Sequence, residues 1–321
     1  MMIEPARVVH HDCDTGIDDA MALLYLLLDP RIEVAGISTV FGNISAKMAA
    51  VNCLRVLELT GRTDIPVAQG AERTIRGDIP ELAPHVHGAD GLGNTKLPAP
   101  RTAKSTLTAT ELIINTVRRR PGEVHLLATG PLTNLAAALA AEPGLPELVA
   151  GVTVMGGAAD VPGNQTAAAE ANILHDPEAA QAVMSAPWPV TLVPLDVTMK
   201  ELLTENHRAQ LMKGGRVARF VGEMTDFYFD FFRNDSFSQR CSPCHDALAA
   251  AIAVGDVPSL KAPVINVEID CSDGPGRGTT ICDTRGRYRG HPAQPGAHCR
   301  VGLATDGTFP DLLVKRLLNA G

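Results

Sequence analysis

Short apolar runs bounded by glycine and proline alternate along the first two-thirds of the chain with longer segments whose apolar residues recur at helical spacing. The short runs predict buried β-strands and the longer segments predict helices. The expected strands cover residues 8–12, 32–40, 124–128, 149–155 and 190–193. The expected helices cover residues 18–28, 46–59, 108–119, 132–141 and 178–185. This alternation predicts an α/β fold with a mostly parallel sheet and helices on both faces.

Two stretches interrupt the alternation and are expected to be loops. Residues 70–106 are polar and rich in proline and glycine, and they contain the segment His85-Val86-His87-Gly88. Residues 156–172 consist largely of small residues. Long loops in a compact domain commonly carry function, so we expect the first of these to be a functional loop.

The last third of the chain follows a different pattern. Residues 200–240 are expected to be helical and hold the densest aromatic cluster, namely Phe227, Tyr228, Phe229, Phe231 and Phe232. From Val264 onward we expect short added strands and a closing helix over residues 310–318. Because no repeat, low-complexity tract or linker divides the chain, a single domain over residues 1–321 is expected.

The composition is that of a globular protein, and its charge narrows the choice of partners. Of the 321 residues, 45% are hydrophobic and 20% are charged, which suits a sizeable core. The net charge of −8 argues against a nucleic-acid or anionic-membrane surface. Residues 1–7 lack the pattern of a secretory leader, and apolar runs such as residues 21–28 are too short to cross a bilayer. We therefore expect a cytoplasmic enzyme that binds neither nucleic acid nor membranes.

The seven cysteines are scattered and odd in number, which predicts reduced thiols rather than a disulfide framework. Cys241 and Cys244 have C-x-x-C spacing. No second pair follows at the spacing of a zinc ribbon, and no thioredoxin-like context surrounds them. The spacing alone therefore assigns them neither a redox nor a zinc role.

The strongest chemical signal is an acidic turn between an expected strand and an expected helix. Its carboxylates, Asp12, Asp14, Asp18 and Asp19, lie within eight positions around Gly16. Ligands of open α/β sheets bind at the carboxyl ends of strands, where this turn lies. Because carboxylates this close repel one another unless a cation shares them, the turn predicts a hard, oxygen-liganded divalent ion.

Two simpler interpretations explain less of the acidic turn. Helix capping and the helix dipole account for Asp18 or Asp19 but not for Asp12 and Asp14. A calcium EF-hand needs a preceding helix and a glutamate at the twelfth loop position. Counted from Asp12, that position is Leu23, and the preceding segment is an expected strand.

His245 and Asp246 could complete the site if the fold brings them to the acidic turn. They directly precede the helical run at residues 247–254. A histidine can donate a proton near neutral pH, and an aspartate can complete an oxygen cage. A histidine near a helix start is also commonly structural, and spacing alone does not decide between the two.

Amide and carboxylate side chains at other strand ends could bind a polyol. Asn43, Asn164, Glu170 and Asn172 can hydrogen-bond to the vicinal hydroxyls of a sugar. Singly, each of them also fits an ordinary polar loop with Asx turns. Thr129 follows another expected strand, and its segment can either present a backbone carbonyl to the ion or simply start a helix.

Taken in order, these segments resemble the inosine-uridine-preferring nucleoside hydrolase family. The signature segment is Asp12-Cys13-Asp14-Thr15-Gly16-Ile17-Asp18-Asp19-Ala20. Further matching blocks cover residues 40–43, 87–91, 129–134, 155–157, 170–172, 176–180 and 245–246. Several ordered blocks are more specific than one motif, and together they extend the resemblance over nearly the whole chain.

The resemblance implies a single-domain, Rossmann-like, doubly wound and mostly parallel sheet with added C-terminal strands and helices. It implies a hydrolase that uses Ca²⁺ to cleave the N-glycosidic bond of ribonucleosides, releasing ribose and a free nucleobase. Substrates of the inosine, uridine and cytidine type are expected. The resemblance also implies a homo-oligomer, either a dimer or a tetramer.

Carried onto this sequence, the resemblance gives each candidate residue a role. The calcium ligands would be Asp14, Asp19, Asp246 and the backbone carbonyl of Thr129. The ribose would be held by Asp18, Asn43, Asn164, Glu170 and Asn172. The base would be contacted by His87, Tyr228 and Phe232. Asp14 would also activate the attacking water as general base, His245 would donate a proton to the leaving base, and Asp12 would support the turn without binding the ion.

A few positions depart from the family pattern. Thr15 replaces a proline common in the signature, which is a mild change. Ala171 stands where relatives often have a bulkier residue, which would widen the base pocket. Phe232 stands where a tyrosine can occur, which removes a hydroxyl donor. The one tryptophan, Trp188, is expected to be structural, and the lack of stacking tryptophans argues against the purine-specific branch.

Two functions of other classes remain open from the sequence. A haloacid-dehalogenase-type phosphatase uses a D-x-D pair after its first strand, as Asp12 and Asp14 are placed, but the later Ser/Thr, lysine and acidic motifs of that class do not occur here in order. A non-catalytic nucleoside- or sugar-binding protein on the same fold would keep the polyol-binding residues. The presence of His245 beside a full set of oxygen ligands favours catalysis over binding alone.

Overall fold

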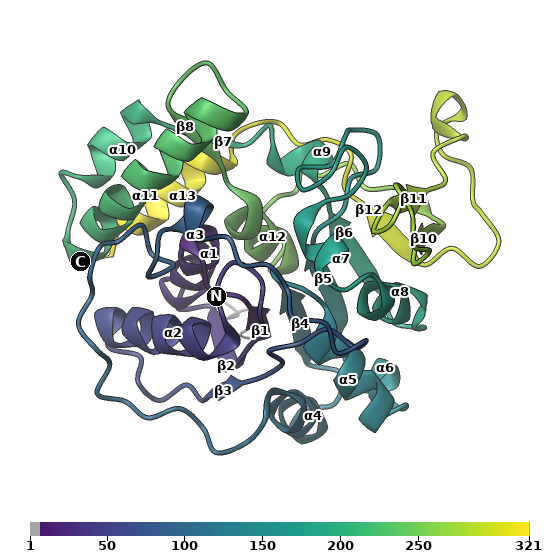
Figure 1. The fold of residues 1–321 in the computed structure, drawn as a ribbon, viewed down its shortest axis with the longest axis horizontal. Helices are drawn as coiled ribbons and strands as arrows, with labels where there is room; N and C mark the ends of the chain where they lie inside the picture. Colours follow the sequence, from purple (N-terminus) through teal and green to yellow (C-terminus); the bar gives the residue numbers. More distant parts are fainter. Residues whose placement is uncertain (1–6, 321) are drawn as a thin grey trace, which may run out of the picture.

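An eight-stranded sheet forms the centre of the molecule (Figure 1). The computed structural model describes residues 7–320. In spatial order the strands are β3 (Val67–Gln69), β2 (Ile32–Thr39), β1 (Arg7–Cys13), β4 (Val124–Ala128), β5 (Gly151–Met155), β6 (Val190–Val193), β12 (Cys299–Val301) and β9 (Val264–Ile265). Every pair is parallel except β12 with β9. The prediction of a mostly parallel α/β sheet is confirmed.

The strand order places the acidic turn where the chain reverses direction across the sheet. From β1 the chain moves outward through β2 and β3, and it then returns to β4 on the other side of β1. This is the doubly wound order, in which ligands bind beyond the carboxyl ends of the strands at such a switch point. The loops after β1, β2, β4 and β5 all leave the sheet at that edge.

Helices cover both faces of the sheet, as Figure 1 shows. They are α1 (Ile17–Leu27), α2 (Ala46–Thr60), α3 (Pro84–His87), α4 (Ala109–Arg119), α5 (Thr133–Ala141), α6 (Leu145–Leu148), α7 (Ala171–His175), α8 (Pro177–Ser185), α9 (Leu195–Thr198), α10 (Glu205–Leu211), α11 (Arg216–Asp235), α12 (His245–Ala253) and α13 (Phe309–Leu318). One apolar cluster packs under α1, α2, α11, α12 and α13, and a second packs under α4, α5 and α8.

The helix that follows the acidic turn is a core helix. All eleven residues of α1 are buried, which agrees with its apolar character on every side. Its first turn is closed by the carboxylate of Asp19, which accepts the backbone N–H of Gly16 at 2.9 Å. Asp19 is therefore fixed by the start of the helix to which it belongs.

The prediction for residues 200–240 is wrong in part. The segment does contain α10 and α11, but β7 (Leu202–Thr204) precedes them and pairs antiparallel with β8 (Cys241–Pro243). This pairing joins residues about forty positions apart, which local periodicity does not reveal. The expected loop over residues 70–106 is largely a loop, although α3 lies within it.

The C-terminal part adds short strands and a closing helix, as expected. β10 (Val267–Ile269) and β11 (Thr280–Cys282) form an antiparallel pair, and the segment after β11, with the 3₁₀ helix η1 (Arg287–Arg289), extends away from the body in Figure 1. All seven cysteines are free thiols. The expectation of no secretory leader concerned residues 1–7, and residues 1–6 lie outside the described residues. No helix between residues 7 and 320 is long and apolar enough to cross a membrane.

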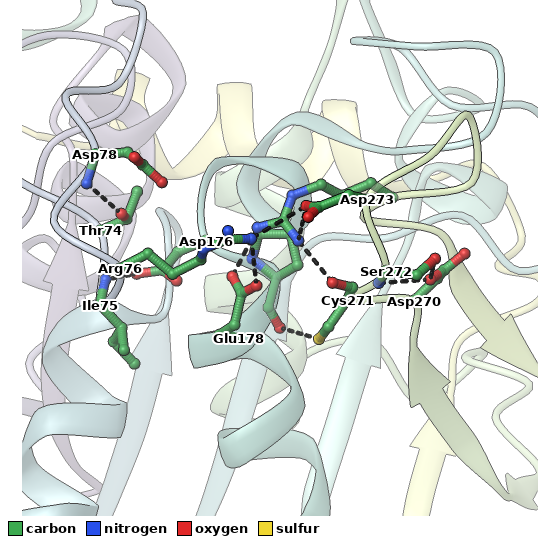
Figure 2. Close-up of polar contacts among 12 residues, drawn as sticks. Thr74, Ile75, Arg76, Asp78, Asp176, Glu178, Asp270, Cys271, Ser272 and Asp273 are labelled. Carbon is green, nitrogen blue, oxygen red and sulfur yellow. Dashed lines mark hydrogen bonds and ion pairs between the residues drawn. The ribbon is translucent and has the colours of Figure 1, made fainter.

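Residues 71–83, which we call the strap, run along the carboxyl edge of the sheet and are tied down by charged side chains (Figure 2). Arg76 on the strap pairs with Glu178 at 3.5 Å and with Asp273 at 3.2 Å. Arg277 donates to the same Glu178 at 2.8 Å. We call these four side chains the charged network. It joins the strap to α8 and to the loop after β10.

Candidate active site

The acidic turn meets two neighbouring loops with no spare space. A Cβ on Gly16 would lie 2.5 Å from His87 Nδ1 and 2.7 Å from Asn43 Nδ2. Gly42, after β2, has a φ of +154°, and a Cβ there would lie 2.0 Å from Asp14 Oδ2. Both positions need glycine because the backbone approaches functional side chains this closely.

Asp14 and Asp19 are held by the same asparagine. Asn43 donates to Asp14 from its backbone N–H at 2.7 Å and from Nδ2 at 3.1 Å. The same Nδ2 donates to Asp19 Oδ2 at 3.1 Å. The hydroxyl of Thr129, just after β4, donates to Asp19 Oδ1 at 2.7 Å. Loops after three strands thus converge on these two carboxylates.

The fold brings Asp246 to the acidic turn, which spacing alone left open. α12 packs beside α1, and one oxygen from each of Asp18, Asp19 and Asp246 lies within 4.8 Å of the others. Tyr228 donates its hydroxyl to Asp18 Oδ2 at 3.0 Å. The other oxygen, Asp18 Oδ1, is buried and has no hydrogen-bond partner among the described residues.

Burial and mutual repulsion disfavour the charged forms of these carboxylates. Burial raises the pKa of Asp18 to about 6. Burial, then the charge of Asp19, raises the pKa of Asp14 well above its ordinary value. Burial, then the charges of Asp18 and Asp19, does the same for Asp246. No lysine or arginine within residues 7–320 neutralises the group. Buried hard oxygen donors, one of them unpartnered, fit a divalent cation.

A cavity of about 350 Å³ opens beside these carboxylates, a size typical of small-molecule sites. Its lining includes Asp18, Asn43, His87, Thr129, Asn164, Glu170, Asn172, Tyr228, Phe232, His245 and Asp246. Asp14 and Asp19 do not line it, because they are buried behind Asn43 and Thr129. Every candidate site residue therefore lies in the wall of this cavity or directly behind it.

The polar residues on one side of the cavity are set by α7 and its preceding loop. Glu170 caps α7 by accepting the backbone N–H groups of Asn172 at 3.0 Å and Ile173 at 3.2 Å. The amide nitrogen of Asn172 donates to the backbone carbonyls of Thr129 and Met155, each at 3.2 Å. These bonds leave Asn172 Oδ1 as an acceptor. Asn164 is exposed at the rim.

Aromatic and imidazole rings form the opposite wall. The ring of His87 lies 5.4 Å from that of Tyr228, and Tyr228 lies 4.8 Å from Phe232 in an edge-to-face contact. His87 Nδ1 accepts the backbone N–H of Ile17 at 3.1 Å. Burial lowers the pKa of His87 to about 4, so the neutral ring carries its proton on Nε2.

His245 reaches the same wall from the first turn of α12. Its Nδ1 lies 2.8 Å from the hydroxyl of Thr198, and its ring centroid lies 6.1 Å from that of Phe232. Burial and then His87 lower the pKa of His245 to about 3. The ring is therefore neutral at neutral pH, which refines the expectation that His245 donates a proton, because a neutral imidazole offers only its N–H.

Asp12 lies behind the acidic turn and outside the cavity lining. It accepts hydrogen bonds from the hydroxyl of Ser38 and, at 2.8 Å, from Asn134 Nδ2. Burial raises its pKa to about 7. This placement separates Asp12 from the carboxylates that face the cavity.

Several lining residues were missed by sequence reasoning. Phe231 and His85 stack edge to face with centroids 6.0 Å apart at the mouth of the cavity, and both lie in segments that the sequence had marked. Thr198 in the short helix α9 gave no signal, because its role depends on contact with His245. Trp188 is buried in the second apolar cluster and does not line the cavity, as expected of a structural residue.

Comparison with known proteins identifies the family of this chain. Residues 9–309 match the family model described as inosine-uridine preferring nucleoside hydrolase. A probable uridine nucleosidase 1 of Oryza sativa subsp. japonica is 36% identical over 315 residues, covering 96% of this chain and 95% of that protein. The pyrimidine-specific ribonucleoside hydrolase RihA of Citrobacter koseri is 37% identical over 317 residues, covering 97% and 98%.

Solved structures extend the likeness to the whole fold. The plant nucleoside hydrolase PpNRh1 superposes with a TM-score of 0.92 at 32% identity, covering 98% of this chain and 100% of that one. A purine-preferring ribonucleoside hydrolase from Gardnerella vaginalis gives a TM-score of 0.90 at 30% identity, covering 98% and 99%. The phosphatase alternative has no support among these relatives. The chain belongs to the inosine-uridine preferring nucleoside hydrolase family, and it is a hydrolase acting on N-glycosyl compounds.

Proposed function

We propose that the protein hydrolyses ribonucleosides to ribose and free base with the help of Ca²⁺. The observation that carries the proposal is the group of buried carboxylates, with no lysine or arginine between residues 7 and 320 to neutralise it, at the base of a nucleoside-sized cavity. Hard oxygen donors of this kind favour calcium over softer metals. Asp14, Asp19, Asp246 and the carbonyl of Thr129 would hold the ion. A bound divalent cation orients the attacking water and lowers its pKa.

Asp14 is proposed as the general base. An ionised aspartate beside the ion can accept a proton from the water that the ion would hold. The two hydrogen bonds from Asn43 hold the carboxylate of Asp14 in one orientation. A carboxylate fixed in this way suits the removal of a proton from water as it attacks the anomeric carbon.

Two roles fit Asp18, namely a ligand of the ion and a partner of the ribose. Its unpartnered oxygen lies near those of Asp19 and Asp246, which would also suit a ligand of the ion. We keep Asp18 on the ribose because it lines the cavity whereas Asp14 does not. Asn43, Asn164, Glu170 and Asn172 would bind the other hydroxyl groups. Carboxylates beside the sugar also stabilise the positive charge of an oxocarbenium-like transition state.

His245 is proposed to assist departure of the base. With Nδ1 accepting the hydroxyl proton of Thr198, the neutral ring presents Nε2–H to the cavity. A neutral imidazole assists by hydrogen bonding rather than by full proton transfer, so its contribution is expected near the lower end of the range of roughly 10²- to 10⁴-fold that is typical of general acids. His87 presents a second N–H on the same wall, and Tyr228 and Phe232 supply the apolar surface against which a base can stack.

Pyrimidine ribonucleosides and inosine are the proposed substrates. Two of the relatives described above are named for uridine or for pyrimidines, and no tryptophan lines the cavity, which argues against an enzyme specific for purines alone. The homo-oligomeric state, dimer or tetramer, and the cytoplasmic location stay predictions.

The test is a set of initial rates, measured as ribose release, for uridine, cytidine, inosine and 2′-deoxyuridine. The proposal expects turnover of the ribonucleosides and loss of turnover with the deoxy form, because the ribose-binding residues have lost a partner hydroxyl. Binding of uridine without release of ribose would instead favour the non-catalytic binding protein.

A further inference from the structure

Two buried histidines on β1 stand behind the acidic turn and have no part in the mechanism above. His10 and His11 are 1% and 0% exposed. As successive residues of a strand they point to opposite faces of the sheet. In each ring Nε2 makes one hydrogen bond, and Nδ1 is buried without a partner among the described residues. An unpartnered buried nitrogen costs stability. The hydrogen bond made by Nε2 is therefore the feature that can explain the presence of a histidine at each position.

Each histidine contacts a hydroxyl group that in turn contacts a carboxylate. His11 Nε2 lies 2.9 Å from Thr129 Oγ1, and that hydroxyl lies 2.7 Å from Asp19 Oδ1. His10 Nε2 lies 2.9 Å from Ser38 Oγ, and that hydroxyl bonds to Asp12 Oδ1. The two chains of hydrogen bonds run from adjacent residues of β1 to neighbouring segments on its two sides.

The direction of the bonds from His11 follows from counting protons. A hydroxyl group has a single proton, and the ionised carboxylate of Asp19 can only accept. The Thr129 proton therefore goes to Asp19, and Thr129 Oγ1 must accept from His11. His11 therefore carries its proton on Nε2. Its unpartnered Nδ1 is then the nitrogen without a hydrogen, so no N–H group of this ring is buried without an acceptor.

We propose that His11, acting through Thr129, is a positioning residue that orients Asp19 and thereby sets the affinity of the cation site. This inference rests on the proposed function, in which Asp19 and the carbonyl of Thr129 are ligands of the ion. His11 fixes the hydroxyl of the same residue whose carbonyl faces the site. Partners that orient ligand carboxylates commonly change metal affinity by about 10- to 100-fold.

A direct ligand role for His11 does not fit the contacts. Ligand atoms of His11, Cys13 and Asp19 also lie within 4.8 Å of one another. However, His11 Nε2 is engaged by Thr129, the Cys13 thiol lies 3.3 Å from the hydroxyl of Thr15, and neither His11 nor Cys13 lines the cavity. Cys13 and His11 therefore belong to the packing behind the site, whereas Asp18 and Asp246 line the cavity.

His125 offers a matched control within the same sheet. Its Nε2 lies 2.8 Å from the hydroxyl of Thr153 on the adjacent strand, so it makes the same type of bond as His11. Its position in β4 is level with Val9 in β1, toward the opposite edge of the sheet from the acidic turn. Thr153 contacts no carboxylate among the described residues, so no chain of hydrogen bonds leads from His125 to a carboxylate.

The experiment measures calcium affinity by isothermal titration of the full-length protein, with the calcium-dependent rise in melting temperature as a second readout. His11→Leu fills the buried position with an apolar side chain but removes the N–H donor, and we expect a 10- to 100-fold weaker calcium affinity. His11→Gln restores an N–H donor and is expected to bind within about threefold of the unmodified protein. His125→Leu is expected to leave calcium affinity unchanged.

A second pair tests the same bonds without altering the histidine. Thr129→Val should weaken calcium binding, Thr129→Ser should not, and His11→Leu added to Thr129→Val should cause no further loss, because the bonds are already broken. This pair also decides the matter if His11→Leu does not fold. Unchanged affinity in His11→Leu or Thr129→Val, or additive losses in the double variant, would overturn the inference alone. Failure of the unmodified protein to bind calcium would overturn the cation site and this inference together.

Discussion

The acidic turn and the charged network both contain carboxylates close together, but the surroundings of the two groups are opposite. In the turn, Asp14 and Asp18 are 1% and 5% exposed, and no arginine or lysine in the described part of the chain pairs with them. In the network, Arg277 and Glu178 are about a quarter exposed and pair at 2.8 Å. Burial alone would raise the pKa of Glu178, but the bond from Arg277 keeps it below its ordinary value.

This contrast separates charges that stabilise the fold from charges that are available to a ligand. The network is complete in itself, because each acid has a guanidinium beside it. The turn keeps carboxylates whose charged forms are disfavoured until something positive arrives. A site that is electrostatically incomplete in the folded chain is a site built for a ligand. If mutations in the two regions changed turnover to a similar extent, this separation would be wrong.

The largest effect is expected for Asp14→Asn, which keeps the shape of the side chain but removes the proposed general base. Turnover of uridine should fall by roughly 10³-fold or more. Asp12→Asn is the matched control from the same turn, because Asp12 lies behind the site and does not line the cavity. Steady-state kinetics with equal losses in both variants would remove the distinction between them.

His245→Ala should lower turnover of uridine by on the order of 10²-fold. The loss should be much smaller for an aryl riboside with an activated leaving group, since that group departs without a hydrogen-bond donor. The ratio of the two rates therefore reports on the donor role. A similar loss on both substrates would assign His245 to binding or structure instead.

His125 tests a half-buried polar group that lies away from the site. Burial lowers its pKa from 6.5 to about 4, so between these values the unfolded chain binds a proton that the folded chain does not. The free energy of unfolding should therefore fall as pH decreases from 6.5 to 4. His125→Gln should reduce this fall by roughly 1–3 kcal/mol, measured by urea unfolding from pH 7 to pH 4. An equal fall in the variant would mean that His125 does not contribute.

The smallest effect is expected in the charged network. Arg277→Gln should cost less than about 1 kcal/mol of stability, because exposed ion pairs are screened by solvent. Turnover of uridine should stay within about twofold of the unmodified protein. A loss of turnover comparable with that of His245→Ala would show that the network holds the strap in a way that catalysis needs.

Patterns that are local in the chain predict much of this protein, and contacts between distant segments account for the rest. Alternating apolar runs predicted the parallel sheet, and the acidic turn at the end of β1 was visible as four nearby aspartates. The meeting of Asp246 with that turn came from the resemblance to a family, because no periodicity relates residues 14 and 246. The pairing of β7 with β8, the neutral state of His245 and the bond from His11 to Thr129 all depend on partners far away in sequence.

If the carboxylates of the turn act with a calcium ion, turnover must depend on that ion. Initial rates of ribose release from uridine are recorded before chelation, after removal of divalent ions with a calcium chelator, and after calcium is added back in excess. We expect loss of turnover on chelation and its recovery with calcium. Unchanged turnover after complete removal of divalent ions would show that the carboxylates work without a cation.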